Sequence, residues 1–374
     1  MKPENFNPPS IVPITPLVRF LVSLLAITAG TFAPLVAALK PDYHLDVDPD
    51  RMPAGYYSAE TPAVLTIKSG ETVEFDTLAL MGLSDDNPEK FFTDNNISLD
   101  LPSVKKMIAV KKALAGKAAS SAPLAGPVYV EGAQPGDTLE VRIVDIKSYT
   151  PFDINVGNPG KGGIPDVIPR PYSKVMKFDL KKNTAKFSDT VDIPLRQFQG
   201  IMAVSPTKER GKLPSRPPYP DIGGNMDNKH LVKGTTLFLP VQIEGAGFYV
   251  ADPHAAQGNG EVSQSAIESS NTVTLQFIVR KDIHIKGPRA ETPTHYIAMG
   301  FNEDLDVAMH QTIVNTIDLL KDVKGMNFFD ALSLSSVGVD YEVTEVVDIT
   351  KGVHAMIPKS LFHDDHPPAY WYKE

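Results

Sequence analysis

The sequence predicts an α+β fold dominated by β-structure, in which packed, sandwich-like β-sheets carry a helical layer. Two features of the chain favour this fold class. Short segments rich in β-branched residues recur along the chain, and glycine and proline separate them, as expected for strands and turns. One long segment instead repeats its apolar residues at the spacing of a helix. Apolar residues make up 42% of the 374 residues, which is enough to fill a large core.

The predicted strands share β-branched residues and, in several cases, an alternation of apolar and polar side chains. Residues 72–78 follow Ser69-Gly70-Glu71, and residues 138–146 follow Pro135-Gly136-Asp137, so each of these strands begins directly after a turn. The other predicted strands are residues 235–243, 248–251, 272–279 and 342–349.

The predicted long helix occupies residues 302–325. Asn302 is its expected N-cap, because an asparagine side chain can accept a hydrogen bond from the first helical turn. Gly325 is expected to end it, since glycine adopts the left-handed conformation that terminates many helices. A second, shorter helix is predicted over residues 104–115. The face of the long helix expected to join the core consists of Leu305, Met309, Ile313, Ile317 and Leu320.

The N-terminus has the layout of a signal peptide over residues 1–38. Arg19 precedes an uncharged apolar run, residues 20–39, which ends in small residues. Pro34 and the small residues favour cleavage after Ala38, which predicts a secreted or periplasmic protein whose catalytic region is residues 39–374. The alternative is an uncleaved membrane anchor, because about 20 apolar residues can span a bilayer. Contact with a membrane is expected only in that case.

Composition excludes several classes of function. The formal net charge is −9 and no long basic run is present, so nucleic acid is not an expected partner. There are no cysteines, which excludes disulfides, thiolate metal sites and cysteine nucleophiles. Any bound metal therefore requires histidine, carboxylate, amide or backbone ligands.

The segment Gly223-Gly224-Asn225-Met226-Asp227 is the first candidate for chemistry. Two glycines let the backbone turn tightly and approach a ligand, and they present Asn225 and Asp227 as oxygen donors. The alternative is an ordinary loop, since turns favour the same residue types.

The second candidate runs from Ala251 to Glu261. It follows a predicted strand, and Gly258 and Gly260 allow a return of the chain that brings Glu261 back toward Asp252 and His254. Aspartate, histidine and glutamate on one glycine-rich turn form a plausible metal site. The alternative is a structural turn in which Asp252 caps the backbone.

The remaining histidines are expected to be structural. No acidic partner is evident in the sequence for His44, His230, His284 and His310. His354 follows Lys351 at the end of a predicted strand, and we favour a hydrogen bond to a backbone carbonyl over a role at the site.

Four segments of the chain, at residues 126–146, 223–262, 299–320 and 343–362, follow one another in a characteristic order. Together they resemble the acetamidase/formamidase family. This resemblance implies hydrolysis of short amides such as formamide or acetamide to carboxylate and ammonia, a divalent metal, for which zinc is expected, and a homo-oligomer. It also implies that the polar site contains Asp227, Asp252, His254 and Glu261. We predict Asp227 and His254 as metal ligands and Asp252 and Glu261 as catalytic residues. The segments are GPVYVEGAQPGDTLEVRIVDI (126–146), GGNMDNKHLVKGTTLFLPVQIEGAGFYVADPHAAQGNGEV (223–262), MGFNEDLDVAMHQTIVNTIDLL (299–320) and VTEVVDITKGVHAMIPKSLF (343–362).

One departure from the family's pattern limits these expectations. Ala122 and Ala125 stand where the family commonly has a histidine and a threonine. If that histidine is a ligand, the site lacks one donor. An active exported amidase is therefore one hypothesis, and a catalytically silent relative with a binding or structural role is another. A third is hydrolysis of a bulkier amide, because the proline-rich loops at 155–171 and 206–224 can shape a different pocket.

Overall fold

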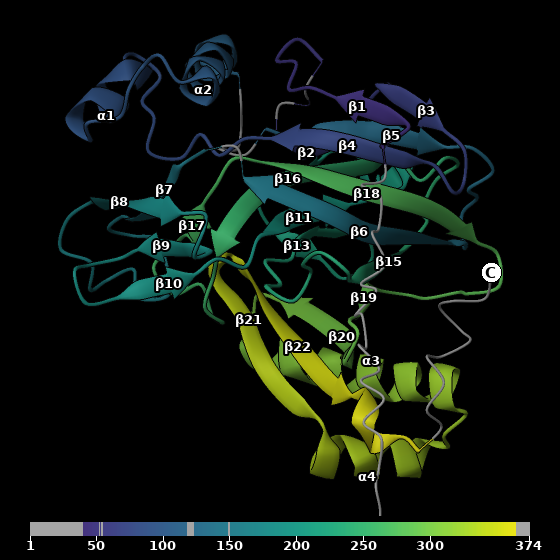
Figure 1. Cartoon of the computed structure of the whole chain (residues 1–374). Helices are drawn as coiled ribbons and strands as arrows, with labels where there is room; N and C mark the ends of the chain where they lie inside the picture. Colours follow the sequence, from purple (N-terminus) through teal and green to yellow (C-terminus); the bar gives the residue numbers. More distant parts are fainter. Residues whose placement is uncertain (1–39, 52, 54, 118–122, 149, 364–374) are drawn as a thin grey trace, which may run out of the picture. The chain divides into compact units, whose positions relative to one another are not determined.

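Two large β-sheets face each other across the main core in the computed structural model, which describes residues 40–363 apart from 52, 54, 118–122 and 149 (Figure 1). Helices cover parts of this arrangement, so the predicted β-dominated sandwich with helices is confirmed. All the described strands and helices belong to one unit that begins at Pro41.

The first sheet has nine strands and contains five of the six predicted strands. Nearly all of its neighbouring strands are antiparallel; only the edge strand β1 pairs in parallel, with β4. Its order is β1 (Tyr43–Leu45), β4 (Thr72–Thr77), β18 (Asn271–Arg280), β6 (Thr138–Ser148), β15 (Thr236–Pro240), β19 (Arg289–Glu291), β20 (His295–Asn302), β22 (Thr350–Pro358) and β21 (Asp340–Asp348).

The second sheet has eleven strands, and its centre carries the residues on which the site depends. Two further strands form a separate pair, β12 (Leu213–Pro214) with β2 (Tyr56–Tyr57). The main order is β10 (Asp192–Pro194), β9 (Thr184–Lys186), β8 (Tyr172–Asp179), β7 (Phe152–Gly157), β17 (Ile267–Glu268), β16 (Phe248–Ala256), β11 (Phe198–Ala203), β14 (Gly223–Asn225) and β13 (Pro218–Tyr219), with β5 (Ala125–Val130) paired to β16 and β3 (Leu65–Ile67) paired to β5.

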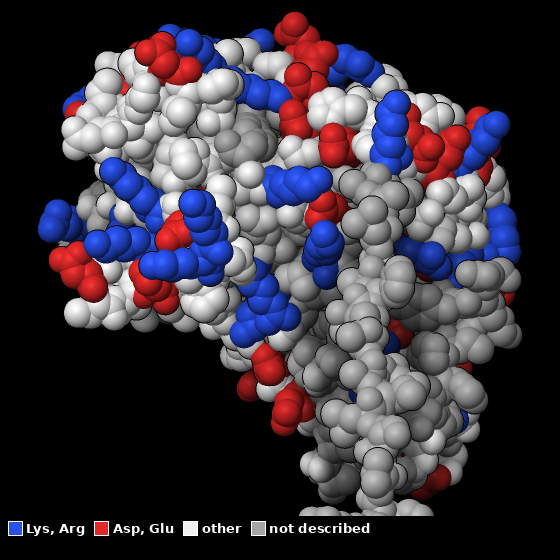
Figure 2. Space-filling view, in the orientation of Figure 1, with Lys and Arg blue, Asp and Glu red and all other residues white. Residues whose placement is uncertain are grey.

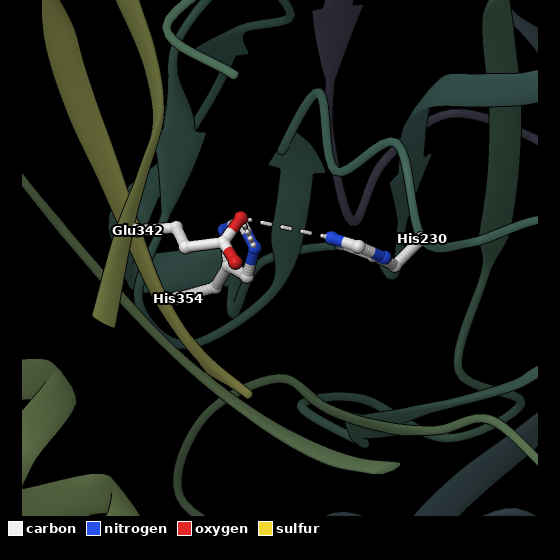
Figure 3. A group of neighbouring side chains, drawn as sticks. All are labelled: His230, Glu342 and His354. Carbon is white, nitrogen blue, oxygen red and sulfur yellow. Dashed lines mark ion pairs between the residues drawn. The ribbon is translucent and has the colours of Figure 1, made fainter. Parts of the chain in front are cut away.

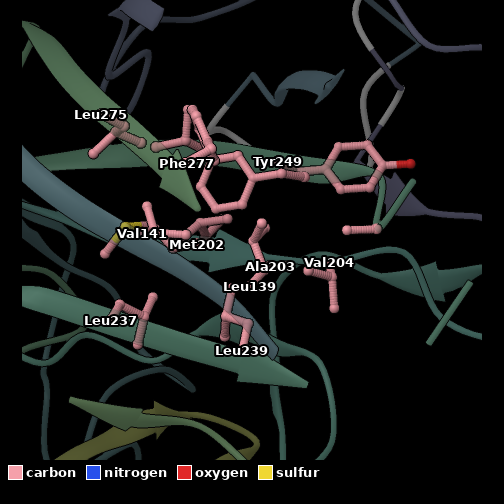
Figure 4. Close-up of a cluster of buried hydrophobic side chains, with 14 of the residues drawn as sticks. Leu139, Val141, Met202, Ala203, Val204, Leu237, Leu239, Tyr249, Leu275 and Phe277 are labelled. Carbon is pink, nitrogen blue, oxygen red and sulfur yellow. The ribbon is translucent and has the colours of Figure 1, made fainter. Parts of the chain in front are cut away.

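The core between the sheets is formed by alternating side chains from both of them (Figure 4). Leu275 and Phe277 come from β18, whereas Met202 and Tyr249 come from β11 and β16. The ring centroids of Phe248 and Phe277 lie 4.9 Å apart across the sandwich, and the two rings meet edge to face. Burying a side chain of this size stabilises the fold by about 1.5–3 kcal/mol, so the core holds the two sheets in a fixed relation.

Four helices accompany the sheets among the described residues. The helices α3 (Leu305–Lys324) and α4 (Phe328–Gly338) bury their apolar sides in a cluster with residues of β15, β20 and β22, as Figure 1 shows below the sheet. The helices α1 (Pro88–Asp94) and α2 (Pro102–Leu114) form a second cluster with Phe152 of β7. Short 3-10 turns occupy Lys208–Arg210 and Lys359–Leu361.

The predicted long helix is confirmed, but its predicted N-cap residue is wrong. Asp304, rather than Asn302, is the N-cap of α3, and its carboxylate accepts hydrogen bonds from the backbone of the first turn. Asn302 lies in β20 and accepts a hydrogen bond from the Asp304 amide instead. Gly325 ends the helix with φ of 64°, as predicted. The fully buried stripe also differs, since Ala308, Thr312 and Thr316 are buried while Leu305, Met309 and Ile313 are half-buried.

The predicted leader, residues 1–38, lies outside the described residues. Among the residues that the structure describes, no helix is both long and apolar enough to cross a lipid bilayer. Figure 2 shows Lys and Arg side chains gathered where β8, β9 and β10 lie in Figure 1, with Asp and Glu among them. Ion pairs such as Lys186 with Asp189, at 2.8 Å, neutralise part of this charge.

Candidate active site

The centre of the second sheet brings the four predicted site residues together. Strand β11 pairs with β14 on one side and with β16 on the other. Asp227 lies two residues after the end of β14, and Asp252 and His254 lie two residues apart on β16. Glu261 returns to the same place from the segment after β16. Short β-pairings thus gather donors that are up to 34 residues apart in the chain (261 − 227).

The imidazole of His254 lies at the middle of this cluster. Its Nδ1 is 3.7 Å from an oxygen of Asp227, and its Nε2 is 3.3 Å from Asp252 and 3.4 Å from Glu268. Donor atoms of His254, Glu261 and Glu268 lie within 4.8 Å of one another. Donor atoms of Asp227, Glu261 and Asp348 do the same, so the groups overlap in a single cluster.

Two members of this carboxylate cluster, Glu268 and Asp348, were not predicted. Glu268 lies in β17, directly opposite His254 on β16. Asp348 ends β21 and accepts hydrogen bonds from Asn225 and from Arg216, the latter at 3.1 Å. The sequence did point toward Asp348, because this residue lies in the segment 343–362. No local pattern distinguishes Glu268, because the pairing of β17 with β16 brings it to His254.

The predicted glycine-rich turn is only partly correct. Asp252 and His254 do not lie on a turn, because β16 continues to Ala256 instead of ending at Ala251. Only Glu261 sits on the turn, where its amide donates to the carbonyl of Gly258. The strand continues because β11 supplies backbone partners opposite these residues, a contact that the local sequence does not reveal.

Backbone strain is concentrated at the same carboxylates. Asp227, Asp252 and Glu261 have positive φ values of 46°, 59° and 46°. Residues other than glycine rarely adopt this region, and such strain collects at functional sites. Gly200 on β11 provides the room, since a Cβ there would lie 2.7 Å from a carboxylate oxygen of Asp252 and closer still to Asp227.

The cluster fits a divalent cation. Within the described residues, both carboxylate oxygens of Asp227 are buried without a hydrogen-bond partner, and so is Oε2 of Glu261. Five carboxylates surround one imidazole, and Arg216 pairs with one of them, Asp348. Buried charges of one sign require protons or a cation, and carboxylate and imidazole are suitable ligands for one.

The pKa shifts of the cluster residues reflect the same excess of negative charge. Burial raises the pKa of Asp227 well above its usual range, and the neighbouring Glu261 raises it further. Burial likewise raises the pKa of Glu261, although His254 opposes the shift. For His254, burial works against the charged form, but Asp252 and Glu268 outweigh it and raise its pKa well above the ordinary value. A cation bound here would replace protons that these carboxylates otherwise retain.

The carboxylate cluster opens to solvent through Glu261. This residue lines a pocket of about 580 Å³ together with Gln257, Asn259 and Lys229. Much of the remaining wall is apolar, with Met176 among its residues. A separate pocket of about 210 Å³ near His284 contains no residue of the cluster, so it is not connected with this chemistry.

Three expectations for other histidines need correction. His44 has an acidic partner, with its Nδ1 3.1 Å from Glu74. His230 also has one, since its Nε2 lies 3.9 Å from Glu342. His354 is buried as predicted, but its Nδ1 bonds the hydroxyl of Thr344 at 2.7 Å and not a backbone carbonyl.

The departure at position 122 lies outside the described residues, so its relation to the cluster stays a prediction. Ala125 begins β5 and is buried. The described part of the cluster contains a single imidazole, that of His254.

The sequence matches the profile of the Acetamidase/Formamidase family over residues 56–216 and 214–364. A formamidase from Methylophilus methylotrophus is 26% identical over 318 residues, which cover 66% of this chain and 78% of that protein. The crystal structure of an acetamidase from Bacillus halodurans superposes with a TM-score of 0.70 at 26% identity, covering 85% of this chain and 98% of that one. An acetamidase from Yersinia enterocolitica gives a TM-score of 0.71 at 25% identity, covering 87% and 95%.

Proposed function

The chain belongs to the acetamidase/formamidase family, and on that basis we propose that it hydrolyses the carbon–nitrogen bond of small linear amides to carboxylate and ammonia with the help of a divalent metal. The observation that carries this proposal is a buried carboxylate–imidazole cluster that reaches an open pocket through one member, Glu261. The relatives named formamidase and acetamidase support the reaction class.

Asp227 and His254 are the proposed metal ligands. Asp227 has two buried oxygens free of hydrogen bonds, and His254 is positioned by Gln257, whose Oε1 lies 3.0 Å from its Nδ1. Asp252, 3.3 Å from Nε2 of the ring, remains the second proposed catalytic carboxylate beside Glu261, and its donor atom lies within 4.8 Å of those of Asp227 and His254. Zinc is the proposed ion, because imidazole and carboxylate together suit it. A bound divalent ion supplies Lewis-acid polarisation of the amide carbonyl and makes water easier to deprotonate.

Glu261 is the proposed general base and acid. It is the cluster carboxylate that also lines the pocket, so it can meet both a water molecule and an amide. In this role Glu261 accepts a proton from water as the oxygen attacks the carbonyl carbon, and it returns that proton to the departing nitrogen. Burial raises the pKa of Glu261, which favours its protonated form and so suits the return of the proton to the departing nitrogen.

The size of the pocket favours a second candidate substrate class. A volume of about 580 Å³ lies in the range that holds drug-sized ligands, and the wall contains apolar side chains such as Phe187 and Ile193. Amides with an apolar substituent would bury that substituent against this wall, with a gain of about 0.8 kcal/mol per methylene. Their hydrolysis would use the same cluster.

The test is ammonia release by purified, zinc-loaded protein from formamide, acetamide and a series of amides with longer apolar chains. We expect turnover on at least one amide at an ordinary enzymatic rate, on the order of 10 per second. His254→Ala should lower it more than about 100-fold, since even residues behind the ligands contribute 10–100-fold. His284→Ala, at an exposed histidine outside the cluster, is the matched control. Absence of ammonia from every amide, in folded and metal-loaded protein, would instead support the catalytically silent relative.

We further propose that the protein is exported and forms a homo-oligomer. Export is supported by the apolar run that follows Arg19, and it predicts a mature N-terminus near Leu39 in protein recovered outside the cytoplasm. Cytosolic protein that retains Met1 would contradict it. Light scattering on the purified protein tests the oligomer, and a monomeric mass would exclude it.

A further inference from the structure

A second group of ligand-type side chains lies outside the carboxylate cluster (Figure 3). Strands β21 and β22 place Glu342 directly opposite His354, and Oε2 of Glu342 is 3.6 Å from Nε2 of His354. His230, on the segment between β14 and β15, approaches the same oxygen with its Nε2 at 3.9 Å. The three donor atoms lie within 4.8 Å of one another, and none of these residues belongs to the carboxylate cluster.

Two imidazole nitrogens of this group have no hydrogen-bond partner within the described chain. They are the Nε2 atoms of His230 and His354, and both are buried. The side chain of His354 has no exposed surface. Thr344 engages the other nitrogen of His354 at 2.7 Å. If Nδ1 donates this bond, Nε2 turns its lone pair toward the carboxylate, which is the arrangement of a metal-bound histidine with an outer partner.

The charge states of two of these groups, His230 and Glu342, also suit a cation. Burial and the nearby His354 lower the pKa of His230 to about 4, so its imidazole is neutral at physiological pH. The contact with His354 lowers the pKa of Glu342 to about 2, so its carboxylate is ionised. Metal ligands must be deprotonated in this way before they can bind.

The distances are close to those of a tetrahedral site. Zinc bonds of 2.0–2.2 Å place neighbouring donor atoms of a tetrahedron about 3.3–3.6 Å apart. The observed 3.6 and 3.9 Å therefore require only small side-chain adjustments. One contact must change, because Nη2 of Arg196 lies 3.3 Å from Nδ1 of His230, which has to carry a proton when Nε2 binds a metal. Arg196 is exposed, so its guanidinium can turn into solvent.

We propose that His230, Glu342 and His354 form a second metal site, specific for a transition metal of the zinc class. Two imidazoles and one carboxylate favour zinc, cobalt, nickel or copper over magnesium and calcium. The carboxylate cluster has one imidazole among five carboxylates and is the harder site of the two. The two sites therefore differ in metal preference.

The place of this second site gives it a structural role at the pocket. Asn259 donates to Glu342, and the amide of Gly260 donates to the carbonyl of Thr344 at 2.9 Å. Asn259 belongs to the pocket wall beside Glu261, and Lys229, next to His230, lines the same pocket. A metal held by the three residues would connect the segment at His230 to the hairpin of β21 and β22. The turn that carries Glu261 is joined to the same hairpin through Asn259 and Gly260.

Metal counting on the full chain tests the proposal. Wild-type protein loaded with zinc should contain two ions per chain by elemental analysis, and cobalt loading should produce visible absorption from the imidazole-rich site. His230→Gln and Glu342→Gln should each weaken zinc binding at one site more than about 100-fold and abolish that absorption. These variants are preferred to changes at His354, since the side chains of His230 and Glu342 are 12% and 34% exposed and tolerate substitution better.

Asp227→Asn is the matched variant at the carboxylate cluster. It should retain the cobalt absorption of the second site while losing the other ion, which separates failure of this proposal from failure of the proposed function. Folding of each variant is checked by circular dichroism. Folded His230→Gln and Glu342→Gln proteins with the wild-type metal count and cobalt spectrum would overturn the second site, and so would a wild-type protein that binds neither zinc nor cobalt there.

Discussion

Replacing Gly200 by alanine should remove metal binding at the carboxylate cluster while leaving the protein folded. Gly200 lies in β11 beneath the cluster, and its φ is outside the left-handed region, so alanine can adopt the same backbone. The new Cβ would lie 2.7 Å from Oδ2 of Asp252 and still closer to Oδ1 of Asp227. Both atoms are the ends of side chains, which can move, whereas the strand cannot.

The magnitude follows from the displacement. An ordinary contact between carbon and oxygen is about 3.4 Å, so Asp252 must retreat by about 0.7 Å and Asp227 by more. Metal–ligand distances tolerate only about 0.2 Å, so at least one carboxylate leaves coordination. We expect metal affinity to fall about 100-fold, which corresponds to about 2.7 kcal/mol.

Isothermal titration calorimetry of metal-free protein with zinc measures the change in metal affinity. Urea denaturation measures the stability of the fold. Gly258→Ala is the matched control, because a Cβ at Gly258 meets no atom within 4 Å and its φ is also unremarkable. It makes the same chemical change beside the same pocket and should bind metal as the wild type does. A folded Gly200→Ala protein with wild-type zinc affinity would refute the assignment of Asp227 and Asp252 to the site.

Three further predictions concern stability. Burial outweighs the ion pair with Lys359 and raises the pKa of Glu291 from 4.5 to about 7. Because the pKa in the folded state is the higher one, this contribution to stability is complete below pH 4.5 and is lost as the pH rises through 7, a change of about 3 kcal/mol. Glu291→Gln should therefore flatten the pH dependence of the unfolding free energy, and an unchanged slope between about pH 5 and 8 in urea denaturation would contradict this. Asp304→Ala should lower the unfolding free energy by about 1 kcal/mol through loss of the N-cap of α3, whereas Glu303→Ala, one residue earlier, should change it by less than about 0.5 kcal/mol. Chelation of the metal should destabilise the protein more at pH 8 than at pH 5, because burial raises the pKa of Asp227 and a proton replaces the cation more fully at the lower pH; equal losses of melting temperature would contradict this.

Local sequence predicted the strands because their cause is local. The strand predicted over residues 138–146 is β6, and the one predicted over 272–279 is β18, each with small differences at the ends. Both carry β-branched residues and begin or end at turn residues. The helices α1 and α4 were missed because they are short and their burial depends on neighbouring elements, as Phe92 shows by packing against Phe152 of β7.

The site was predictable only as far as its motifs extend. Asp227, Asp252, His254 and Glu261 all stand in the segment 223–262, which the family resemblance had singled out. Glu268 completes the surroundings of His254 through a pairing between β16 and β17, which no local pattern specifies. The same reason explains the error about the strand end, since the extension of β16 past Ala251 depends on β11 as its partner.

The two proposed metal sites draw on the same two stretches of chain, and this links them physically. Residues 225–230 contribute Asp227 to one cluster and His230 to the other. Strand β21 contributes Glu342 to the second cluster and Asp348 to the first. A shift of β21 relative to the segment after β14 would therefore disturb both sites at once. The C-terminal hairpin thus contributes to the proposed active site through Asp348, although all four residues predicted for the site lie before it in the sequence.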